Sequence, residues 1–478
     1  ENRSVRVKSD RPACSPACAR EENFCTYKKY ACGAFCGTLA DSIERLPVCA
    51  HGRTFKKWRN TDMEYKVSEK VQKKFDTLTK DAKVQKALQF MEEDQDTVID
   101  KQIELTLIPA PTNHEQKKAA RLLEMFKEEG LTDCHIDEYG NCVGIRKGTG
   151  GGKTVLVEGH MDTVFPLDTK LEIVREDGFI KCPGIVDDTR GCATVLSTIR
   201  ALNAAGIQTK GDIQFVGTVQ EEGTGALKGM QYYVNHHPEL DASISVDGPG
   251  FEEITYEATG IQTYEINFHG VGGHACGAFA KVANPIHAAG RAIAKIAEIQ
   301  VPKEPMTTFA VTTMQAGSFE AVHAIVPVAQ IRFNFRSNSQ EELEKLRKKI
   351  FDAIDEACKE ETERWGMDTI TYDVKHICDV NAGHQDPHAP IVEGAMAAAE
   401  YLGCEEPKLG NGGSTNCNRA LEAGLPAVCL GMGADYDIHA HMLSEQFKVE
   451  GAYKGCQQTL LLALLCAGMD DVESIIEK

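Results

Sequence analysis

The sequence lacks any apolar run long enough to cross a bilayer, and it lacks an excess of positive charge. A transmembrane helix needs about 20 consecutive apolar residues, whereas the apolar run at 460–466 is short and predicts a core helix. The net charge of −19 argues against nucleic acid or an anionic membrane as the main partner, because both favour a basic surface. The N-terminus has no apolar segment of the secretory type, so we expect no signal peptide and a cytoplasmic location.

Two common ligand-binding patterns are also missing. The glycine-rich run at 148–154 does not predict a phosphate-binding loop, because the first glycine of such a loop would fall at Lys147 and a strand rather than a helix follows. The two Cys-x3-Cys pairs within residues 1–62 lack the Cys-x2-Cys spacing typical of zinc ribbons. The chemistry of the protein must therefore be sought in other residues.

Residues 1–62 differ in composition from the rest of the chain. They hold six of the 18 cysteines and 12 Lys or Arg against 7 Asp or Glu, a net charge of +5 that leaves −24 for residues 63–478. Their poor hydrophobic periodicity predicts a poorly ordered, Cys-containing extension, with a metal module or disulfides as alternatives. Many of the other cysteines lie inside apolar runs, which is typical of reduced, buried thiols.

The remaining residues alternate between helical and strand patterns. Apolar residues recur at helical spacing from 66 to 105 and from 115 to 129. Short apolar strands then alternate with amphipathic helices; the strands are expected at 154–157, 213–219 and 242–246, and the helices at 190–205 and 226–235. This order predicts an α/β domain with a mixed sheet and helices on both faces.

From about residue 256 to 378 the pattern changes to β-α-β-β-α-β, the order typical of a ferredoxin-like domain. The strands are expected at 262–268, 307–314, 325–335 and 369–374, and the helices at 285–299 and 340–365. We therefore expect a catalytic domain made of residues 63–255 and 379–478, interrupted by an inserted α+β domain at 256–378.

Acidic residues and histidines follow several of the predicted strands. Each has an ordinary explanation: Asp187 or Asp188 could cap the following helix, and Glu221 with Glu222 could lie in a solvated loop. Taken together, residues that follow parallel strands converge on one edge of the sheet. Carboxylates and imidazoles gathered there suit Zn²⁺, Mn²⁺ or Co²⁺. The full set is His160, Asp162, Asp187, Asp188, Glu221, Glu222, Asp247 and His441.

In order and spacing, these residues resemble the motifs of the M20 family of di-metal peptidases and amidohydrolases. That family includes tripeptidase T, carboxypeptidase G2-like enzymes and acetylornithine deacetylases. The resemblance runs from about residue 102 to the C-terminus and includes local matches at 270–275, 283–286 and 412–418. It implies metal-dependent hydrolysis of an amide bond in a short peptide or an N-acyl amino acid. The alternatives are a deacylase or desuccinylase without peptidase activity, and an inactive relative that acts as a binding protein.

The resemblance also implies the metal ligands. His160 and Asp247 would bind one divalent ion, Glu222 and His441 would bind the other, and Asp187 would bridge the two. The expected cofactors are two divalent ions, Zn²⁺ first, with Mn²⁺ or Co²⁺ as alternatives.

Three further residues receive catalytic roles from the resemblance. Glu221 would be the general base that acts on the attacking water. Asp162 would hydrogen-bond to His160 and fix its tautomer. His274, in the inserted domain, would reach in from the partner subunit and stabilise the oxyanion, which implies a homodimer with the inserted domain as its dimerisation domain.

Four residues are expected at the substrate. Arg336 matches a family arginine that contacts a substrate carboxylate, a task suited to the bidentate guanidinium. His323 stands where many relatives carry Asn, and Asn416 stands where relatives commonly carry Asp. Gly413 lies in the same motif as Asn416. The two departures leave the identity of the substrate open.

Overall fold

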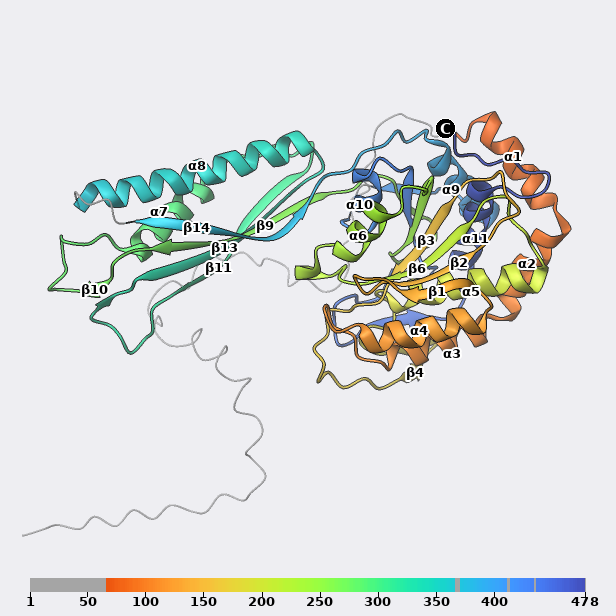
Figure 1. The fold of residues 1–478 in the computed structure, drawn as a ribbon, viewed down its shortest axis with the longest axis horizontal. Coiled ribbons are helices and arrows are strands. Elements are labelled where there is room, and N and C mark those ends of the chain that lie inside the picture. The colour runs from red at the N-terminus through yellow and green to blue at the C-terminus, as the bar shows by residue number, and fades with distance from the viewer. Residues whose placement is uncertain (1–65, 366–369, 411–412, 434–435, 478) are drawn as a thin grey trace, which may run out of the picture. The chain divides into compact units, whose positions relative to one another are not determined.

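The computed structural model describes residues 66–365, 370–410, 413–433 and 436–477. The predicted extension at 1–62 lies outside these residues. The described chain forms a large mixed sheet with helices on both faces, and a four-stranded antiparallel sheet with two helices (Figure 1). The expected fold class is therefore confirmed.

The large sheet has eight strands in the order β1-β2-β6-β3-β7-β16-β8-β15. Its four middle strands run parallel to one another and are fully buried; they are β6 (Ile213–Thr218), β3 (Val155–His160), β7 (Ala242–Val246) and β16 (Ala427–Leu430). Burial on both faces explains why these segments are mostly apolar rather than alternating. The outer strands are β1 (Thr132–Ile136), β2 (Cys142–Arg146), β8 (Glu253–Thr255) and β15 (Lys408–Gly410).

Helices cover both faces of this sheet. On one face, α5 (Thr189–Ala205) and α11 (Tyr453–Ala467) are buried along almost their whole length, so they form the centre of the main core. Further helices pack into that core: α1 (Glu69–Lys80), α2 (Ala82–Glu93), α4 (Gln116–Glu128) and α9 (Pro390–Tyr401). On the other face, α6 (Lys228–His236) and α10 (Cys417–Glu422) pack against Leu156 and Val216.

The structure also contains a small three-stranded sheet that the sequence did not predict. It has the order β17-β5-β4, formed by β17 (Gln446–Lys448), β5 (Phe179–Lys181) and β4 (Val174–Glu176). Next to it, α3 (Gln95–Thr106) contributes Ile99 to a core shared with Ile180 and Phe447. Strands of three residues carry too little periodicity to be recognised in a sequence.

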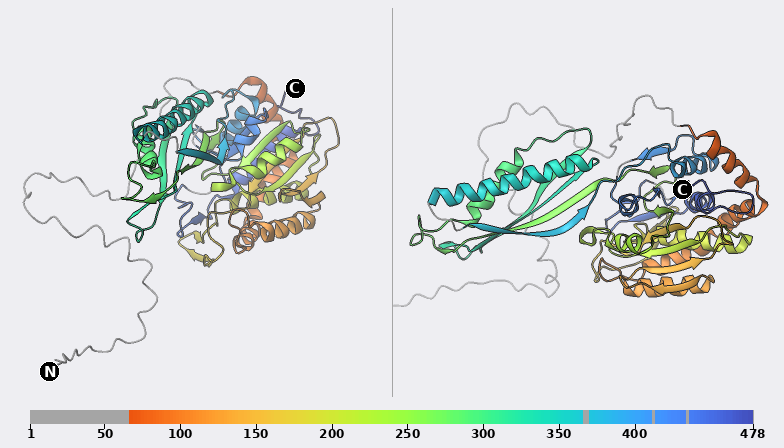
Figure 2. Two further views of the ribbon diagram at one scale, coloured as in Figure 1. Left: turned by 60° about the vertical axis from the view of Figure 1, so that its left-hand side comes forward. Right: turned by 45° about the horizontal axis from the view of Figure 1, so that its top comes forward.

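The second sheet has the order β11-β13-β9-β14 and is antiparallel throughout. Its strands are β9 (Gly260–His269), β11 (Thr307–Ala316), β13 (Val328–Ser337) and β14 (Thr371–Val380), with helices α7 (Pro285–Ala297) and α8 (Gln340–Trp365). The two helices lie along one face of the sheet (Figure 2) and share a core with Tyr264 and Phe333. Two short strands, β10 (Gly273–His274) and β12 (Ala324–Ile325), pair with each other in the loops.

Two glycines bring α5 against the end of β3. A Cβ added to Gly159 would lie 2.7 Å from the backbone carbon of Gly191. A Cβ added to Gly191 would lie 2.3 Å from both the Asp188 side chain and the Val246 carbonyl oxygen. The absence of a side chain at both positions lets the start of α5 approach the carboxyl ends of β3 and β7.

We predict that Gly191→Ala destabilises the protein by about 3 kcal/mol, because the new methyl group meets backbone atoms that cannot move aside independently. The measurement is the free energy of unfolding in urea. Gly290→Ala is the matched control, because Gly290 lies within α7 and a Cβ added there would meet nothing within 4 Å. That control should stabilise α7 by up to about 1 kcal/mol. Equal effects of the two substitutions would contradict the close-approach argument.

Candidate active site

His160 is the last residue of β3, and its imidazole faces two aspartates. Its Nδ1 lies 3.0 Å from the Asp162 carbonyl oxygen and 3.4 Å from Asp162 Oδ1. Its Nε2 lies 3.1 Å from Asp187 Oδ1. With the Nδ1 proton donated to Asp162, the Nε2 lone pair is directed toward Asp187 and is available to a metal ion.

Asp187 and Asp188 have different roles in the structure, and Asp187 is the one that the resemblance assigns to the metal ions. Asp188 caps α5, because its Oδ1 accepts a hydrogen bond of 2.9 Å from the Gly191 N–H. Its Oδ2 accepts a hydrogen bond of 2.8 Å from the backbone N–H of His160. Asp187 instead extends its carboxylate between two imidazoles, with Oδ1 toward His160 and Oδ2 3.0 Å from His441 Nε2.

Glu445 holds the loop that carries Asp187. Its side chain is fully buried. Its Oε1 accepts hydrogen bonds from the backbone N–H groups of Val186 (2.7 Å) and Asp187 (3.0 Å), and its Oε2 accepts one from Gly184 (3.1 Å). A carboxylate bound by three backbone donors fixes the position of this loop.

Asp162 performs a similar task at the end of β6. Its carboxylate accepts hydrogen bonds of 3.0 Å from the backbone N–H groups of both Glu221 and Glu222. It also accepts a hydrogen bond of 2.9 Å from Thr112 Oγ1. The Asp162 side chain thus ties β3 to the Glu221 loop, while its carbonyl oxygen is the nearer partner of the His160 ring.

His441 completes the far side of the cluster. Its Nε2 lies 2.8 Å from Glu222 Oε1 and 3.0 Å from Asp187 Oδ2. Its side chain is 53% exposed, so this side of the cluster is open to solvent. His439, two residues earlier, bonds instead to Asp437 and to the Ser444 carbonyl oxygen.

Asp247 and Glu221 join the same cluster. One potential ligand atom from each of His160, Asp187 and Glu222 lies within 4.8 Å of the others, and the same holds for His160, Glu221 and Asp247. Glu221 Oε2 is 3.9 Å from His160 Nε2, which is too long for a hydrogen bond. The structure therefore brings together all five predicted metal ligands and the predicted base.

The crowding of acids around the imidazoles shifts their pKa values. Burial raises the pKa of Glu221 well above its usual value, and the charges of Asp247 and Glu222 add to that shift. Burial and the Asp187 charge raise the pKa of Asp247 to about 7. Hydrogen bonds to Asp187 and Glu222 raise the pKa of His441 to about 10. These directions reflect four carboxyl groups gathered around two imidazoles with little access to water.

This donor set fits divalent cations. Four carboxylates with little exposure to water are costly unless positive charge offsets them. Imidazole nitrogens and carboxylate oxygens are the ligands that Zn²⁺, Mn²⁺ and Co²⁺ share. Asp187, with one oxygen toward each imidazole, is placed to contact two ions at once.

The predicted residues of the inserted domain fall into two groups. His274 and His323 lie on the paired strands β10 and β12 or next to them, and their ring centroids are 6.4 Å apart. The Nδ1 of His274 accepts hydrogen bonds from the backbone N–H groups of Cys276 (3.3 Å) and Gly277 (3.2 Å). This leaves the Nε2 proton as a donor directed away from the loop.

Arg336 lies near the end of β13, whereas the loops of β10 and β12 adjoin the start of that strand. Arg336 stands eight positions after Val328, the first residue of β13, which is about 27 Å at a rise of about 3.4 Å per residue. Ile261, its partner on β9, packs with Ala226 and Leu227, which follow the Glu222 loop. Within one chain, Arg336 therefore lies toward the metal-ligand residues, and the two histidines lie at the far end of the sheet.

Gly413 and Asn416 lie in a loop against the main sheet. The Gly413 carbonyl oxygen accepts a hydrogen bond of 3.1 Å from the Thr259 N–H. Asn416 is 3% exposed and donates from Nδ2 to Glu158 and Thr218. Its amide nitrogen therefore faces the protein interior.

Three acidic residues around the site fix neighbouring segments by accepting hydrogen bonds, a role that the sequence did not predict for them. Glu445 and Glu158 are buried. Each accepts a hydrogen bond from a residue far away in the chain: Gly184 lies 261 positions from Glu445, and Asn416 lies 258 positions from Glu158. The carboxylate of Asp162 binds backbone donors rather than acting on His160 alone. The only signal in the sequence was an acidic residue inside an apolar strand, as at Glu158.

We predict that Glu445→Gln lowers the affinity for divalent metal about 10–100-fold. The amide has one acceptor oxygen in place of two, so it cannot bind all three backbone donors of the Asp187 loop. Metal content after dialysis and competition with a chelator measure the effect. Glu450→Gln is the matched control, because the Glu450 side chain is 88% exposed. An unchanged metal affinity in Glu445→Gln would show that the loop needs no such support.

Among the described residues, no helix combines the length and apolar character needed to cross a bilayer.

The chain is similar to several known hydrolases. A succinyl-diaminopimelate desuccinylase of Corynebacterium glutamicum is 25% identical over 351 residues, which cover 72% of this chain and 89% of that protein. The crystal structure of aminopeptidase PepT from Bacillus cereus superposes with a TM-score of 0.63 at 24% identity, over 77% of this chain and 97% of that chain. The YXEP protein of Bacillus subtilis, a dinuclear metal binding peptidase from the M20 family, gives a TM-score of 0.57 at 15% identity, over 79% of this chain and 100% of that chain.

The model of peptidase family M20/M25/M40 matches residues 156–465, from β3 with His160 to α11. This match spans well over half of the chain and contains every residue of the metal-ligand cluster. The protein is a hydrolytic enzyme and belongs to peptidase family M20/M25/M40.

Proposed function

We propose that the protein hydrolyses an amide bond in a short peptide or an N-acyl amino acid that carries a free carboxylate. The observation that supports this most directly is the position of Asp187, whose two oxygens face the Nε2 atoms of His160 and His441. A carboxylate between two imidazoles, with a further carboxylate left for proton transfer, is an arrangement that suits two-metal hydrolysis.

His160 and Asp247 would hold one ion, Glu222 and His441 the other, and Asp187 would contact both. The ions, which we propose to be Zn²⁺ with Mn²⁺ or Co²⁺ as alternatives, would supply Lewis acidity to the amide carbonyl and to water. Side chains of the protein would transfer the proton and bind the substrate.

Glu221 is proposed as the general base. Its backbone is fixed by the hydrogen bond from its N–H to Asp162 Oδ1 at 3.0 Å, while its carboxylate makes no contact shorter than 3.9 Å to His160. A carboxylate in this position that binds neither ion can accept a proton from the attacking water and give it to the leaving amine nitrogen. The adjacent Glu222 is held by His441 and is not available for this transfer.

His274 and Arg336 are proposed to bind the substrate from the inserted domain. The Nε2 proton of His274 would donate to the carbonyl oxygen as negative charge develops on it. The guanidinium of Arg336 would pair with the substrate carboxylate. Because Arg336 lies near the end of β13 and His274 lies on β10, in the loops next to the opposite end of the four-stranded sheet, we propose that His274 reaches the site of a second copy in a homodimer.

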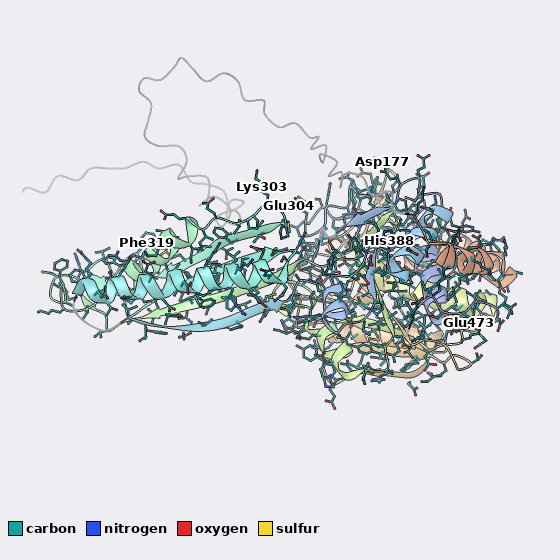
Figure 3. The ribbon with its side chains drawn as sticks, turned by 90° about the horizontal axis from the view of Figure 1, so that it is seen from above. Asp177, Lys303, Glu304, Phe319, His388 and Glu473 are labelled. Atoms are coloured by element: carbon teal, nitrogen blue, oxygen red, sulfur yellow. The ribbon has the colours of Figure 1, made fainter. Side chains whose placement is uncertain are left out.

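The surface around His274 supports this assembly. Four large apolar side chains in the neighbouring loops are strongly exposed: Val271 (68%), Phe279 (65%), Val322 (71%) and Phe319 (99%), the last of which is labelled in Figure 3. Clustered exposed apolar residues are typical of surfaces that another protein covers. A second copy that docks here would bury these side chains and receive His274.

The desuccinylase relative favours a second candidate function. An N-acyl amino acid and a peptide both present an amide bond and a carboxylate, so the metal-ligand residues do not distinguish them. The distinction depends on residues that contact the acyl or amino-terminal side of the substrate. An inactive binding relative is disfavoured, because Glu221 and the full ligand set are present.

We predict that Glu221→Gln lowers kcat about 10²–10⁴-fold and keeps the metal, because Gln retains the shape of Glu but cannot take a proton. Release of free amine is measured for di- and tripeptides and for N-acetyl and N-succinyl amino acids, with Zn²⁺, Mn²⁺ and Co²⁺. Glu363→Gln, at a side chain that is 66% exposed, is the control. Activity toward the N-acyl substrates alone would establish the deacylase candidate. No amine release from any substrate would refute the proposed function, and full activity in Glu221→Gln would refute the base.

We also predict that His274→Ala and Glu221→Gln subunits complement each other when they are mixed and reassembled. The heterodimer then has one site with an intact Glu221 and an intact His274 from the other copy, so it regains about half of the wild-type kcat. Heterodimers purified with two different affinity tags provide the measurement. A confirmed heterodimer that stays inactive would show that each site uses its own His274.

A further inference from the structure

A buried carboxylate lies directly beneath the metal-ligand residues. Glu158 precedes His160 by two positions on β3, so the two side chains point to the same face of the sheet. Glu158 is 1% exposed, and its Oε2 accepts hydrogen bonds from Thr218 Oγ1 (3.1 Å) and Asn416 Nδ2 (2.9 Å). Both donors are neutral groups. A position buried inside a strand, where an apolar side chain is usual, therefore holds an acid whose donors carry no charge.

Asn416 commits both of its amide hydrogens to this sheet. Its Nδ2 donates to Glu158 Oε2 and, at 2.8 Å, to Thr218 Oγ1, while its Oδ1 has no hydrogen-bond partner among the described residues. If the amide turned outward to a substrate, the buried Glu158 carboxylate would lose a donor, which is costly at such a position. These hydrogen bonds hold Asn416 to β3 and β6, and they leave its amide N–H groups unavailable to a substrate.

The segment that Asn416 anchors, residues 413–419, holds both chain connections to the inserted domain. We call it the joint segment. Asn418 Nδ2 donates to the carbonyl oxygens of Thr259 (2.9 Å), which precedes β9, and of Asn381 (3.3 Å), which follows β14. Arg419 Nη2 donates to the carbonyl oxygens of Asp379 on β14 and Ala226 after the Glu222 loop, both at 2.9 Å.

We propose that Glu158 and Asn416 are positioning residues for the reaction. Their hydrogen bond fixes the joint segment to the strand that carries His160, and the joint segment in turn fixes the start and the end of the inserted domain. The pair thereby sets the position of Arg336, and of the surface that carries His274, relative to the metal ligands. This proposal rests on the proposed function for its kinetic readout, and it replaces the substrate contact expected for Asn416.

A reciprocal exchange separates positioning from simple stabilisation. In Asn416→Asp, a carboxylate oxygen replaces the amide donor 2.9 Å from Glu158 Oε2, so two buried carboxylates face each other. In the double variant Glu158→Gln with Asn416→Asp, the Gln amide can donate to the new Asp, and the hydrogen bond returns with its direction reversed. Glu158→Gln alone keeps an acceptor oxygen for Asn416.

We predict that Asn416→Asp lowers kcat about 100-fold, the cost of a displacement of about 1 Å in groups that align a substrate. Its metal content should equal that of the wild type. Glu158→Gln alone should lose less than about tenfold, and the double variant should recover at least about tenfold over Asn416→Asp. Tyr233→Phe is the control for the loss of a buried hydrogen bond on the same face, since the Tyr233 hydroxyl donates to Gln214 at 2.7 Å; its kcat should not change.

Wild-type kcat in Asn416→Asp would overturn the proposal. It would also be overturned if the double variant folds, binds metal and is no more active than Asn416→Asp. If Asn416→Asp does not fold, Asn416→Ser takes its place, which donates one hydrogen in place of two and adds no charge; a wild-type kcat there would be equally decisive.

Hydrogen exchange keeps the proposal separate from the proposed function. Exchange of the backbone amides at 413–419 and 259–262 should speed up in Asn416→Asp and slow again in the double variant, whatever the substrate is. If the wild-type enzyme cleaves none of the amides tested but this exchange pattern appears, the proposed function fails and the anchoring role stands. Unchanged exchange in Asn416→Asp would refute the anchoring role itself.

Discussion

The contact of one carboxylate with two imidazoles is the constraint on which the rest of the site depends. Asp187 can face both His160 and His441 only if its loop, the end of β3 and the loop of His441 keep fixed positions relative to one another. Glu445, four residues after His441, binds backbone N–H groups of the Asp187 loop and so joins the Asp187 loop to the His441 loop. Asp188 binds the backbone N–H of His160, and Asp162 fixes the neighbouring Glu221 loop in the same way. The glycines at 159 and 191 make this possible, because they let α5 approach the strand ends.

The same arrangement concentrates negative charge at the edge of the sheet. Carboxylates that bind backbone donors are satisfied by those donors, but Asp187, Glu221, Glu222 and Asp247 face one another across a small space. Burial, together with that crowding, raises the pKa values of Glu221 and Asp247. Divalent cations would relieve that crowding and would leave Glu221 free for the proton transfer that we propose, so the electrostatic demand of the fold would suit the proposed amide hydrolysis.

Much of the fold and the positions of the ligand residues could be predicted from the sequence, because both depend on local patterns. Buried parallel strands are recognisable as short apolar runs, and residues that follow them gather at one edge, which is why His160, Glu221 and Asp247 could be expected near one another. Their separate roles came from the resemblance to the M20 family. The supports of the site were harder to foresee. Glu445 meets the Asp187 loop across 258 residues, and Asn416 meets Glu158 across 258 residues, so no periodicity links them. The strand pattern alone did not distinguish Asp187 from Asp188; the resemblance assigned Asp187 to the metal ions, and the hydrogen bond from the Gly191 N–H shows that Asp188 caps α5.

The central claim is that Asp187 lies between two metal ions, and anomalous X-ray diffraction from crystals grown with Zn²⁺ tests it most directly. Data collected on both sides of the zinc absorption edge identify the ions and locate them without reference to activity. The account predicts two peaks, one beside His160 and Asp247 and the other beside His441 and Glu222, with Asp187 in contact with both. A single peak at full occupancy, or two peaks that do not share Asp187, would contradict it.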